Sequence, residues 1–443
     1  MTFRDILQKI NGVCISGNLD EQFVGKFRLN SKKVEFNDCF IAINGGHDFI
    51  NEAIENGAKL IICNNNFNSQ KVTVIIVEDT KEVLLSLVDL IRNKYLDIPV
   101  IAVTGSVGKT TTKELIYKIL SSKYNVLKNE GNKNNRIGLS ETMFQLSNDY
   151  DVCVVEMGMN HLGEISDLSK CAKPNIGIIT NIGTSHIGYL GSKKNIYRAK
   201  RELLDGIDGG VILINGDDKY LKRLKYKQII RVGLNKSNDF VAFNIVTTKK
   251  HLYFNFNYNN RRYNVKFNIP NESLVTNILF AIFIGLQFNI DPEIILEQLS
   301  TYLPEQHRNN IIHLGDKTTL IDDCYNASYE SIKGGLSMLK NYSQEKIIVI
   351  GDVLELGKYS KNIHKKIGKL LRKEIGLIIL VGNEVKYAYN DEFVLKSNYN
   401  EVIDYLKTIN LDNKLIYLKG SRKIKLDEVK KYLLEEYKNG FTM

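Results

Sequence analysis

Apolar and polar residues follow three successive patterns along the chain. In residues 1–95, short apolar runs such as DCFIAI and VTVIIVED are separated by Gly- and Asn-rich turns, which predicts a small α/β unit. From residue 96, apolar strand-like runs are each followed by a helical stretch, and this pattern restarts after residue 308. The sequence therefore predicts an α/β fold of three domains, at residues 1–95, 96–308 and 309–443.

The central segment is predicted to contain a mostly parallel sheet. The runs IPVIAVTG, DVCVVEMG, NIGIITNIG and GGVILING are continuously apolar, as strands covered on both faces are. Residues 238–269 instead alternate polar and apolar positions, which predicts an antiparallel excursion, and a helix is expected at roughly 271–288. After residue 308, TTLIDDCYN, KIIVIGDV, GLIILVGN and KLIYLKGS each precede an amphipathic stretch, so a second, Rossmann-like sheet is expected.

Composition places the chain among ordinary globular proteins. Of its 443 residues, 43% are hydrophobic and 25% are charged, which excludes wholesale disorder. No apolar run reaches the roughly 18–20 residues that span a bilayer, so no membrane insertion is expected. Charges in MTFRDILQKINGV, where a signal peptide needs an apolar run, and six scattered cysteines predict a cytoplasmic protein with reduced thiols.

The net charge of +10 leaves several anionic partners open, namely nucleic acid, an anionic membrane face or small substrates. A single-stranded nucleic-acid groove would interleave basic and aromatic residues. Here the lysines are spread over helices, and in KLDEVKKYLLEEYK they alternate with glutamates. The charge pattern therefore favours small anionic ligands over nucleic acid.

The segment TGSVGKTTTKE, at residues 104–114, joins a predicted strand to a helix through a Gly-rich turn. Such a turn directs backbone N–H groups and the positive end of a helix at a phosphate. Lys109 can reach the β- and γ-phosphates, and the Thr110 hydroxyl can bind Mg²⁺. Val103 occupies the first glycine position of the strict motif, so the interpretation depends on strand, turn and helix together. The predicted nucleotide-binding residues of the turn are Gly105, Ser106, Gly108, Lys109, Thr110 and Thr111.

Two further strand ends carry candidate chemistry. Glu156 closes the run DVCVVE, where a carboxylate is costly unless it is paired or bound to metal. His186 lies in TNIGTSHIGYLGS, after the next apolar run. Carboxyl ends of strands in open α/β sheets are where ligands bind, so both are candidate site residues. Spacing alone does not distinguish Lys200 from the other basic residues of KKNIYRAKRELLDGI.

These motifs, taken in order, resemble those of the Mur ligases. TGSVGKTTTKE, GNKNNRIGLSET, EMGMNHLGEI, NIGTSHIGYLGS and LINGDD resemble the central ATPase domain of that family. IDDCYNASYESI, IGDVLELG and LKGSRKIKLDEV resemble the third domain, and NSKKVEFNDCFIAINGGHDFINEAIENGA is similar to the UDP-binding module. The resemblance covers essentially the whole chain. It implies a UDP-binding domain, a P-loop-type ATPase domain and a C-terminal Rossmann-like domain that binds the incoming amine.

The resemblance also implies an activity. The expected enzyme is a monomeric ATP-dependent ligase that joins D-alanyl-D-alanine to UDP-N-acetylmuramoyl tripeptide through an acyl phosphate, in peptidoglycan precursor synthesis. It implies ATP, two Mg²⁺ ions and a Lys200 carbamylated by CO₂, which converts a cation into an anion able to bind metal. Lys109, Glu156, His186 and Lys200 are the implied catalytic residues, and Thr110 joins the last three at the metals. Other implied ligand contacts are Asn277, Arg308 and Asp323 at the nucleotide, Ser31, Gly46 and His47 at UDP, and Asn326, Asp352, Glu355, Lys419 and Ser421 in the third domain.

The chain departs from the family pattern outside the phosphate and metal motifs. The departures are Asn30-Ser31-Lys32 for Asp-Ser-Arg, Ser273-Leu274 for His-Asn, His307-Arg308 for Gly-Arg, Cys324 for Ser, and Ser328-Tyr329 for Asn-Pro. A paralogue that joins another amino acid or peptide to another carboxylate is therefore an alternative. A nucleic-acid-dependent P-loop ATPase is a second, less favoured one.

Overall fold

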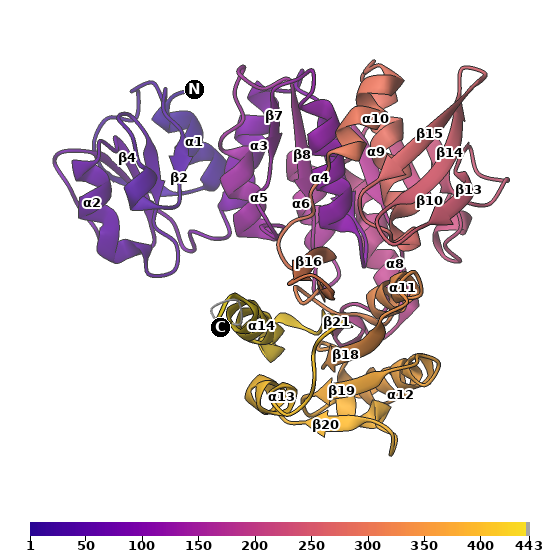
Figure 1. The fold of residues 1–443 in the computed structure, drawn as a ribbon. Helices are drawn as coiled ribbons and strands as arrows, with labels where there is room; N and C mark the ends of the chain where they lie inside the picture. The colour runs from indigo at the N-terminus through magenta and orange to yellow at the C-terminus, as the bar shows by residue number, and fades with distance from the viewer. Residues whose placement is uncertain (440–443) are drawn as a thin grey trace.

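The computed structural model describes residues 1–439, which form three α/β units, each built on its own main sheet (Figure 1). The last four residues of the predicted 309–443 domain lie outside the described residues. In Figure 1 the N-terminal unit lies to the left of the central unit, and the C-terminal unit lies below the central unit. The predicted α/β class with mostly parallel sheets is confirmed. Among residues 1–439, no helix combines the length and apolar character needed to cross a bilayer.

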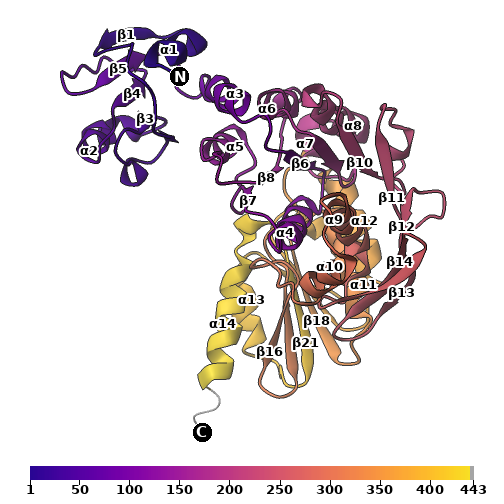
Figure 2. The same ribbon diagram turned by 90° about the horizontal axis from the view of Figure 1, so that it is seen from above.

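The N-terminal unit is a five-stranded sheet in the order β1-β5-β4-β3-β2, in which only β1 is antiparallel to its neighbour. Its strands are β1 (Val13–Ser16), β2 (Phe27–Arg28), β3 (Cys39–Ile41), β4 (Leu60–Cys63) and β5 (Thr73–Ile76). Its helices are α1 (Phe3–Ile10) and α2 (Ile50–Glu55), and α3 (Leu84–Lys94) follows. Helix α3 packs against α1 on one side and against two helices of the central unit, α5 (Arg136–Met143) and α6 (Glu164–Ala172), on the other, so it links the two units (Figure 2).

The central unit has seven parallel strands in the order β12-β11-β10-β9-β6-β8-β7. They are β6 (Val100–Thr104), β7 (Val126–Lys128), β8 (Val152–Glu156), β9 (Ile176–Ile179), β10 (Val211–Asn215), β11 (Ile229–Gly233) and β12 (Phe240–Val241). Its helices are α4 (Lys109–Leu120), α5 (Arg136–Met143), α6 (Glu164–Ala172), α7 (Ile187–Leu190), α8 (Lys193–Arg201), α9 (Val275–Gln287) and α10 (Pro292–Ser300). The apolar face of α4, formed by Leu115, Ile116, Ile119 and Leu120, is fully buried, which is what holds the start of this helix beside β6.

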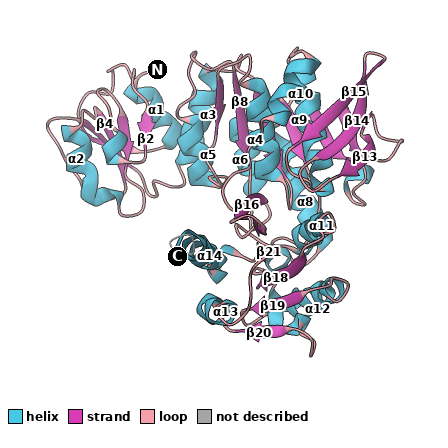
Figure 3. Ribbon diagram, viewed as in Figure 1, coloured by secondary structure: helices cyan, strands magenta, loops and turns pink. Residues whose placement is uncertain are grey.

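The antiparallel excursion predicted at residues 238–269 is confirmed for most of its length. A three-stranded antiparallel sheet is formed by β13 (Phe243–Thr247), β14 (Leu252–Tyr258) and β15 (Arg261–Phe267) (Figure 3). The start of the range differs, because Phe240 and Val241 pair in parallel with β11 as the edge of the main sheet. Inward-facing Phe254 and Phe256 are buried, so the alternation marks one face packed on the core.

The C-terminal unit is a six-stranded sheet in the order β16-β17-β21-β18-β19-β20, parallel except for β16. Its strands are β16 (Asn310–Leu314), β17 (Thr318–Asp322), β18 (Glu345–Gly351), β19 (Leu377–Val381), β20 (Val394–Lys396) and β21 (Lys414–Lys419). Its helices are α11 (Tyr329–Leu339), α12 (Ser360–Leu371), α13 (Tyr399–Leu406) and α14 (Leu426–Asn439). The four predicted strands are present, and two short edge strands, β16 and β20, join them.

The carboxyl ends of the central strands meet at one edge of the sheet. Val103 pairs with Glu156 across β6 and β8, and Thr104 pairs with Ile179 across β6 and β9. The register therefore brings the Gly-rich turn, Glu156 and the segment after β9 together, on the side that faces the C-terminal unit.

Candidate active site

The Gly-rich turn after β6 can be built only with glycine at two positions. Gly105 and Gly108 have φ of +147° and +84°, in the region that disfavours other residues. A Cβ on Gly105 would lie 1.9 Å from Thr180 Oγ1, and one on Gly108 would lie 2.6 Å from Asn277 Nδ2. Helix α4 begins at the next residue, so its first N–H groups, which have no partner inside the helix, are directed at the turn. The turn is shaped for a phosphate, and residues 105–109 are called the phosphate turn from here on.

Lys109 folds back over this turn. Its Nζ donates a hydrogen bond to the Gly105 carbonyl oxygen at 3.0 Å. Burial lowers the pKa of the Lys109 ammonium, and the nearby Arg308 guanidinium lowers it further, while Glu156 and Glu355 act in the opposite direction. Two cations and two carboxylates therefore surround the turn, which is a suitable environment for a polyanion with bound cations.

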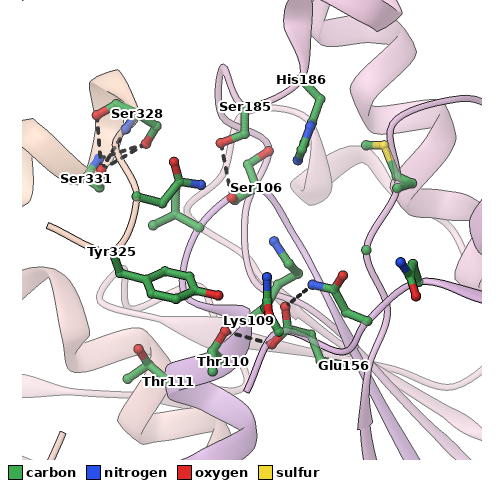
Figure 4. A pocket seen from close by; sticks show the side chains of 18 of the residues that line it. Ser106, Lys109, Thr110, Thr111, Glu156, Ser185, His186, Tyr325, Ser328 and Ser331 are labelled. Atoms are coloured by element: carbon green, nitrogen blue, oxygen red, sulfur yellow. Dashed lines mark hydrogen bonds between the residues drawn. The ribbon is translucent and has the colours of Figure 1, made fainter. Parts of the chain in front are cut away.

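Glu156 is held in one orientation at the end of β8, where its side chain is buried. Its Oε2 accepts a hydrogen bond from Thr110 Oγ1 at 2.7 Å, and its Oε1 accepts one from Asn134 Nδ2 at 2.6 Å (Figure 4). Arg308 Nη2 donates to the same Thr110 hydroxyl at 3.0 Å. Hydroxyl and carboxylate oxygens are the ligands that Mg²⁺ prefers, so Thr110 and Glu156 fit a magnesium site beside the phosphate turn.

His186 lies opposite the phosphate turn and contacts the C-terminal unit (Figure 4). Its Nδ1 lies 2.7 Å from Glu355 Oε2, and this imidazole is the main reason that the pKa of Glu355 lies below its ordinary value. Both residues have positive φ, +62° and +63°. The Gly188 N–H also donates to the Glu355 carbonyl oxygen at 2.9 Å, so this contact joins the two units.

Lys200 carries its amine into the protein interior. Its side chain is 1% exposed, and Nζ has no hydrogen-bond partner among residues 1–439. Burial places the pKa of Lys200 well below its ordinary value, and the charge of Lys109 adds to this, while Glu156, Glu202 and Glu164 oppose it. A buried polar atom that is left unpaired is costly, and an uncharged amine is the form that reacts with CO₂. The environment of Lys200 therefore fits a carbamate.

A cavity of about 870 Å³ lies between the central and C-terminal units. The sequence-predicted residues that line it are Ser106, Gly108, Lys109, Thr110, Thr111, Glu156, His186, Asn277, Arg308, Asp323, Asn326, Glu355 and Lys419. Gly105 and Lys200 do not line the cavity. The Gly105 carbonyl oxygen accepts a hydrogen bond from Lys109, and the charge of Lys109 acts on the Lys200 amine. The fold thus brings residues from both units, up to about 300 positions apart in the sequence, to one cavity.

On the C-terminal side, Lys419 and Asp323 form a buried pair. Lys419 Nζ donates to Asp323 Oδ2 at 2.6 Å and to the Asn326 carbonyl oxygen at 3.1 Å. The Tyr417 hydroxyl donates to the same Asp323 oxygen at 3.3 Å. A buried pair with this many hydrogen bonds holds its side chains in a fixed geometry, so this side of the cavity is preorganised.

Asp352 and Ser421 lie outside the cavity lining, in contact with backbone groups. The Asp352 carboxylate accepts hydrogen bonds from the N–H groups of Asn383, Glu384 and Val385, at 3.1, 3.0 and 2.7 Å. Ser421 Oγ accepts one from the Leu354 N–H at 3.1 Å. Both side chains therefore shape loops at the carboxyl ends of the C-terminal strands.

Ser31, Gly46 and His47 lie in the N-terminal unit and do not line the 870 Å³ cavity. Ser31 Oγ donates to Glu52 Oε2 at 2.5 Å, and His47 Nε2 accepts from the Asn64 N–H at 3.4 Å. A ligand that contacts both this group and the cavity has to extend across the boundary between the two units.

Two site residues were not singled out from the sequence. Asn134, in the quoted GNKNNRIGLSET motif, orients Glu156. Glu330, in the first turn of α11, accepts hydrogen bonds at Oε2 from the Thr184 N–H at 3.1 Å and the Thr184 hydroxyl at 2.7 Å. Lys193 Nζ lies 3.1 Å from the other Glu330 oxygen. No local sequence signal reveals Glu330, because Thr184 is 146 positions away.

We expect Glu330→Gln to loosen the contact between the central and C-terminal units. The glutamine keeps the shape but loses the charge that Thr184 and Lys193 contact, and the pair is partly exposed, so about 1 kcal/mol is expected. In a coupled assay, phosphate released without product should rise about fivefold. Glu345→Gln is the matched control, because Glu345 pairs with Lys414 inside the C-terminal unit. Equal leakage in both variants would contradict a role for Glu330 in closure.

The phosphate turn and the buried carboxylate of Glu156 line one cavity between two α/β units, and the buried amine of Lys200 lies behind them within electrostatic reach of Lys109 and Glu156. This arrangement is typical of a nucleotide-dependent enzyme. Comparison with known proteins identifies the family. Residues 103–285 match the family described as "Mur ligase middle domain", and residues 307–422 match "Mur ligase, glutamate ligase domain". The chain is 31% identical to the UDP-N-acetylmuramoyl-tripeptide--D-alanyl-D-alanine ligase of Bacillus subtilis (strain 168), over 98% of each chain. The chain belongs to the Mur ligase family of ATP-dependent peptide ligases.

Solved structures give the same assignment. The chain superposes on the crystal structure of MurF from Acinetobacter baumannii with a TM-score of 0.89 and 27% identity, over 98% of each chain. It superposes on the MurF ligase of Thermotoga maritima in complex with ADP with a TM-score of 0.84 and 26% identity, over 94% of this chain and 99% of that one. The three-unit architecture is therefore that of the family, and a relative with this architecture binds an adenine nucleotide.

Proposed function

We propose that this chain adds D-alanyl-D-alanine to UDP-N-acetylmuramoyl-tripeptide, with ATP, in peptidoglycan precursor synthesis. The similarity to enzymes of that name extends over almost the whole chain. The observation that carries the proposal is the cavity that faces the phosphate turn on one side and Asp323 and Lys419 on the other. A ligase needs both sides, because one activates a carboxylate with ATP and the other presents the amine.

The chemistry proceeds in two steps. The terminal carboxylate of the tripeptide attacks the γ-phosphorus of ATP, and the bond to ADP breaks, which gives an acyl phosphate. The amine of the dipeptide then attacks the acyl carbon, loses a proton, and phosphate leaves with the C–O bonding pair. Lys109 and Arg308 would neutralise charge on the phosphoryl oxygens, because both line the cavity beside the turn.

Water must be excluded while the acyl phosphate exists, since hydrolysis would waste it. The contacts of Glu355 with His186 and of Glu330 with Thr184 join the two units at the cavity. We assign them to closure over the reacting groups. Opening of these contacts would let substrates enter and products leave.

The residues around the turn fit two Mg²⁺ ions. Thr110 and Glu156 would hold one, and His186 and a carbamylated Lys200 would help to hold the second. When bound, the ions would offset negative charge on the phosphates. The carbamate forms when the neutral Lys200 amine attacks CO₂ and loses a proton, and its formation would remove the unpaired buried amine.

The three units are proposed to divide the ligands. Residues 1–95 would bind the UDP end through Ser31, Gly46 and His47, residues 96–308 would bind ATP, and residues 309–443 would bind the dipeptide. Asn326, Glu355 and Lys419 would contact substrate directly, while Asp352 and Ser421 would shape the loops beside it. We propose a cytoplasmic monomer, which supplies all of these parts from one chain and requires neither nucleic acid nor membrane.

The test is phosphate release with ATP, Mg²⁺ and UDP-N-acetylmuramoyl tripeptide, with and without D-alanyl-D-alanine. We expect phosphate release from ATP to require both the tripeptide and the dipeptide, and one amide product to form per phosphate. L-alanyl-L-alanine, folates and single-stranded DNA serve as comparison additives. Phosphate release at the same rate with and without the dipeptide would contradict this function. Stimulation by folate would favour a paralogue, and stimulation by DNA would favour a nucleic-acid-dependent ATPase.

A further inference from the structure

We propose that His307, Asp322 and Cys324 form a binding site for a divalent transition metal of the Zn²⁺ type. The three residues lie at the junction of the central and C-terminal units, where the chain passes into β16 and where β17 ends. Among the described residues, they are the one group of three His, Cys, Asp or Glu side chains whose ligand atoms all lie within 4.8 Å. The proposed ligase chemistry uses none of the three.

The spacing of the ligand atoms is close to that of a tetrahedral zinc site. Cys324 Sγ lies 3.5 Å from His307 Nδ1, 2.9 Å separates Sγ from Asp322 Oδ1, and 2.9 Å separates Nδ1 from Asp322 Oδ2. Tetrahedral bonds of ordinary zinc–sulfur, zinc–nitrogen and zinc–oxygen length place such atoms about 3.4–3.6 Å apart. The sulfur–nitrogen distance already fits. The two 2.9 Å distances reach different oxygens of Asp322, so the carboxylate has to turn and move away by about half an ångström for one oxygen to bind the metal.

The chemistry of the three donors selects the kind of metal. A thiolate, an imidazole and a carboxylate suit Zn²⁺ and its substitute Co²⁺, whereas Mg²⁺ prefers oxygen ligands only. Asp322 and Cys324 are buried, while the side chain of His307 is 21% exposed. The exposed side provides access and a position for a water as fourth ligand. On binding, the Cys324 thiol would release its proton to solvent.

The backbone also points to a role for the His307 side chain. His307 has φ of +62°, in the left-handed region that glycine adopts most readily and that histidine adopts less often. In this conformation the His307 imidazole contacts the Cys324 thiol, although 17 positions separate the two residues. The backbone therefore holds two potential metal ligands together at the junction of the units.

One neighbouring cation would compete with the metal. Lys430 Nζ lies 2.7 Å from Asp322 Oδ2, and its side chain is 18% exposed. Its amine can therefore turn toward solvent when a metal takes the carboxylate. Removal of the Lys430 charge should therefore tighten metal binding. A purely structural role for the cluster predicts no such increase in metal affinity.

The site would act on the active-site cavity through chain neighbours. His307 immediately precedes Arg308, and Cys324 immediately follows Asp323, and both neighbours line the cavity. A metal that ties residue 307 to residues 322 and 324 would fix the path of the chain between the two units. The inference is independent of which substrates the ligase uses.

The experiment titrates the full-length protein, in excess Mg²⁺ and under reducing conditions, with Zn²⁺ against a chromophoric chelator. We expect one Zn²⁺ per chain. His307→Gly and Cys324→Ser should each weaken binding more than about 100-fold, beyond the usual loss of a supporting partner. Lys430→Gln should tighten it severalfold. Co²⁺ should give a thiolate-to-cobalt absorption band that is lost in Cys324→Ser.

Cys14→Ser and His313→Gln are matched controls, because both residues lie outside the cluster. They should keep the Zn²⁺ affinity and the cobalt band. Circular dichroism checks that every variant is folded. The proposal is overturned if the wild type binds no Zn²⁺, if the cluster variants bind as the wild type does, or if Lys430→Gln weakens binding.

Discussion

Lys109→Ala is expected to lower ATP-dependent phosphate release at least about a thousandfold, with little change in the fold. Lys109 lines the cavity at the start of α4, and its ammonium is the cation that lies over the phosphate turn. Charged groups that act on a transferring phosphoryl group contribute roughly 10³–10⁵-fold in rate. The measurement is single-turnover phosphate release at saturating substrates, with nucleotide affinity measured separately.

The control for this prediction is Lys118→Ala, on the same helix but outside the cavity lining. This variant should retain nearly full activity. Ser273→His, which restores a family residue at the cavity wall, should change the rate far less than Lys109→Ala does. Equal losses in Lys109→Ala and Ser273→His would mean that the phosphate turn has been assigned wrongly.

The central motifs could be predicted because their signals are local. In the Gly-rich turn, strand, glycines, lysine and helix are consecutive, and the packing of β6 and α4 follows from buried apolar faces. Glu156 was predicted from one physical fact, the cost of a carboxylate at the end of an apolar strand. The fold then brings it to Thr110, as the parallel register requires.

Contacts between the units could not be predicted in this way. Glu330 meets Thr184, and Glu355 meets His186, only because the C-terminal sheet docks at one edge of the central sheet. No periodicity encodes that docking, since the partners belong to different units and lie more than 140 positions apart in the sequence. The same holds for Asp352, whose carboxylate the resemblance associates with substrate and whose contacts in the fold are backbone N–H groups.

Lys200 is the residue for which the sequence and the fold differ most in what they reveal. In the sequence it is one of several basic residues on a helix, and nothing local distinguishes it from Lys194. In the fold, Lys194 is exposed, whereas Lys200 is buried near Lys109 and Glu156, and its amine has no hydrogen-bond partner in the part of the chain that the structure describes. Burial, which depends on the tertiary fold, lowers the pKa of this amine and so favours the uncharged form that the proposed carbamate requires.

Lys200→Ala is accordingly expected to abolish ligation, with a loss of at least about a thousandfold, because several kcal/mol of charge stabilisation at the metals would disappear. A short carboxylate such as acetate or formate should restore part of the rate, because it can occupy the space of the deleted side chain and supply the missing oxygens. Amide product is measured with and without the additive. Lys194→Ala should have normal activity and no response to carboxylate.

A second substitution separates chemistry from folding. Lys200→Met keeps the length of the side chain and removes the unpaired buried amine. In CO₂-free buffer its free energy of unfolding, measured in urea, should therefore equal that of the wild type or exceed it by about 1–3 kcal/mol. It should nevertheless be inactive. A stable Lys200→Met or Lys200→Ala enzyme with full activity and no additive would remove the carbamate from the mechanism. An inactive but stable Lys200→Met, together with carboxylate rescue of Lys200→Ala, requires an anion at the position of the Lys200 amine.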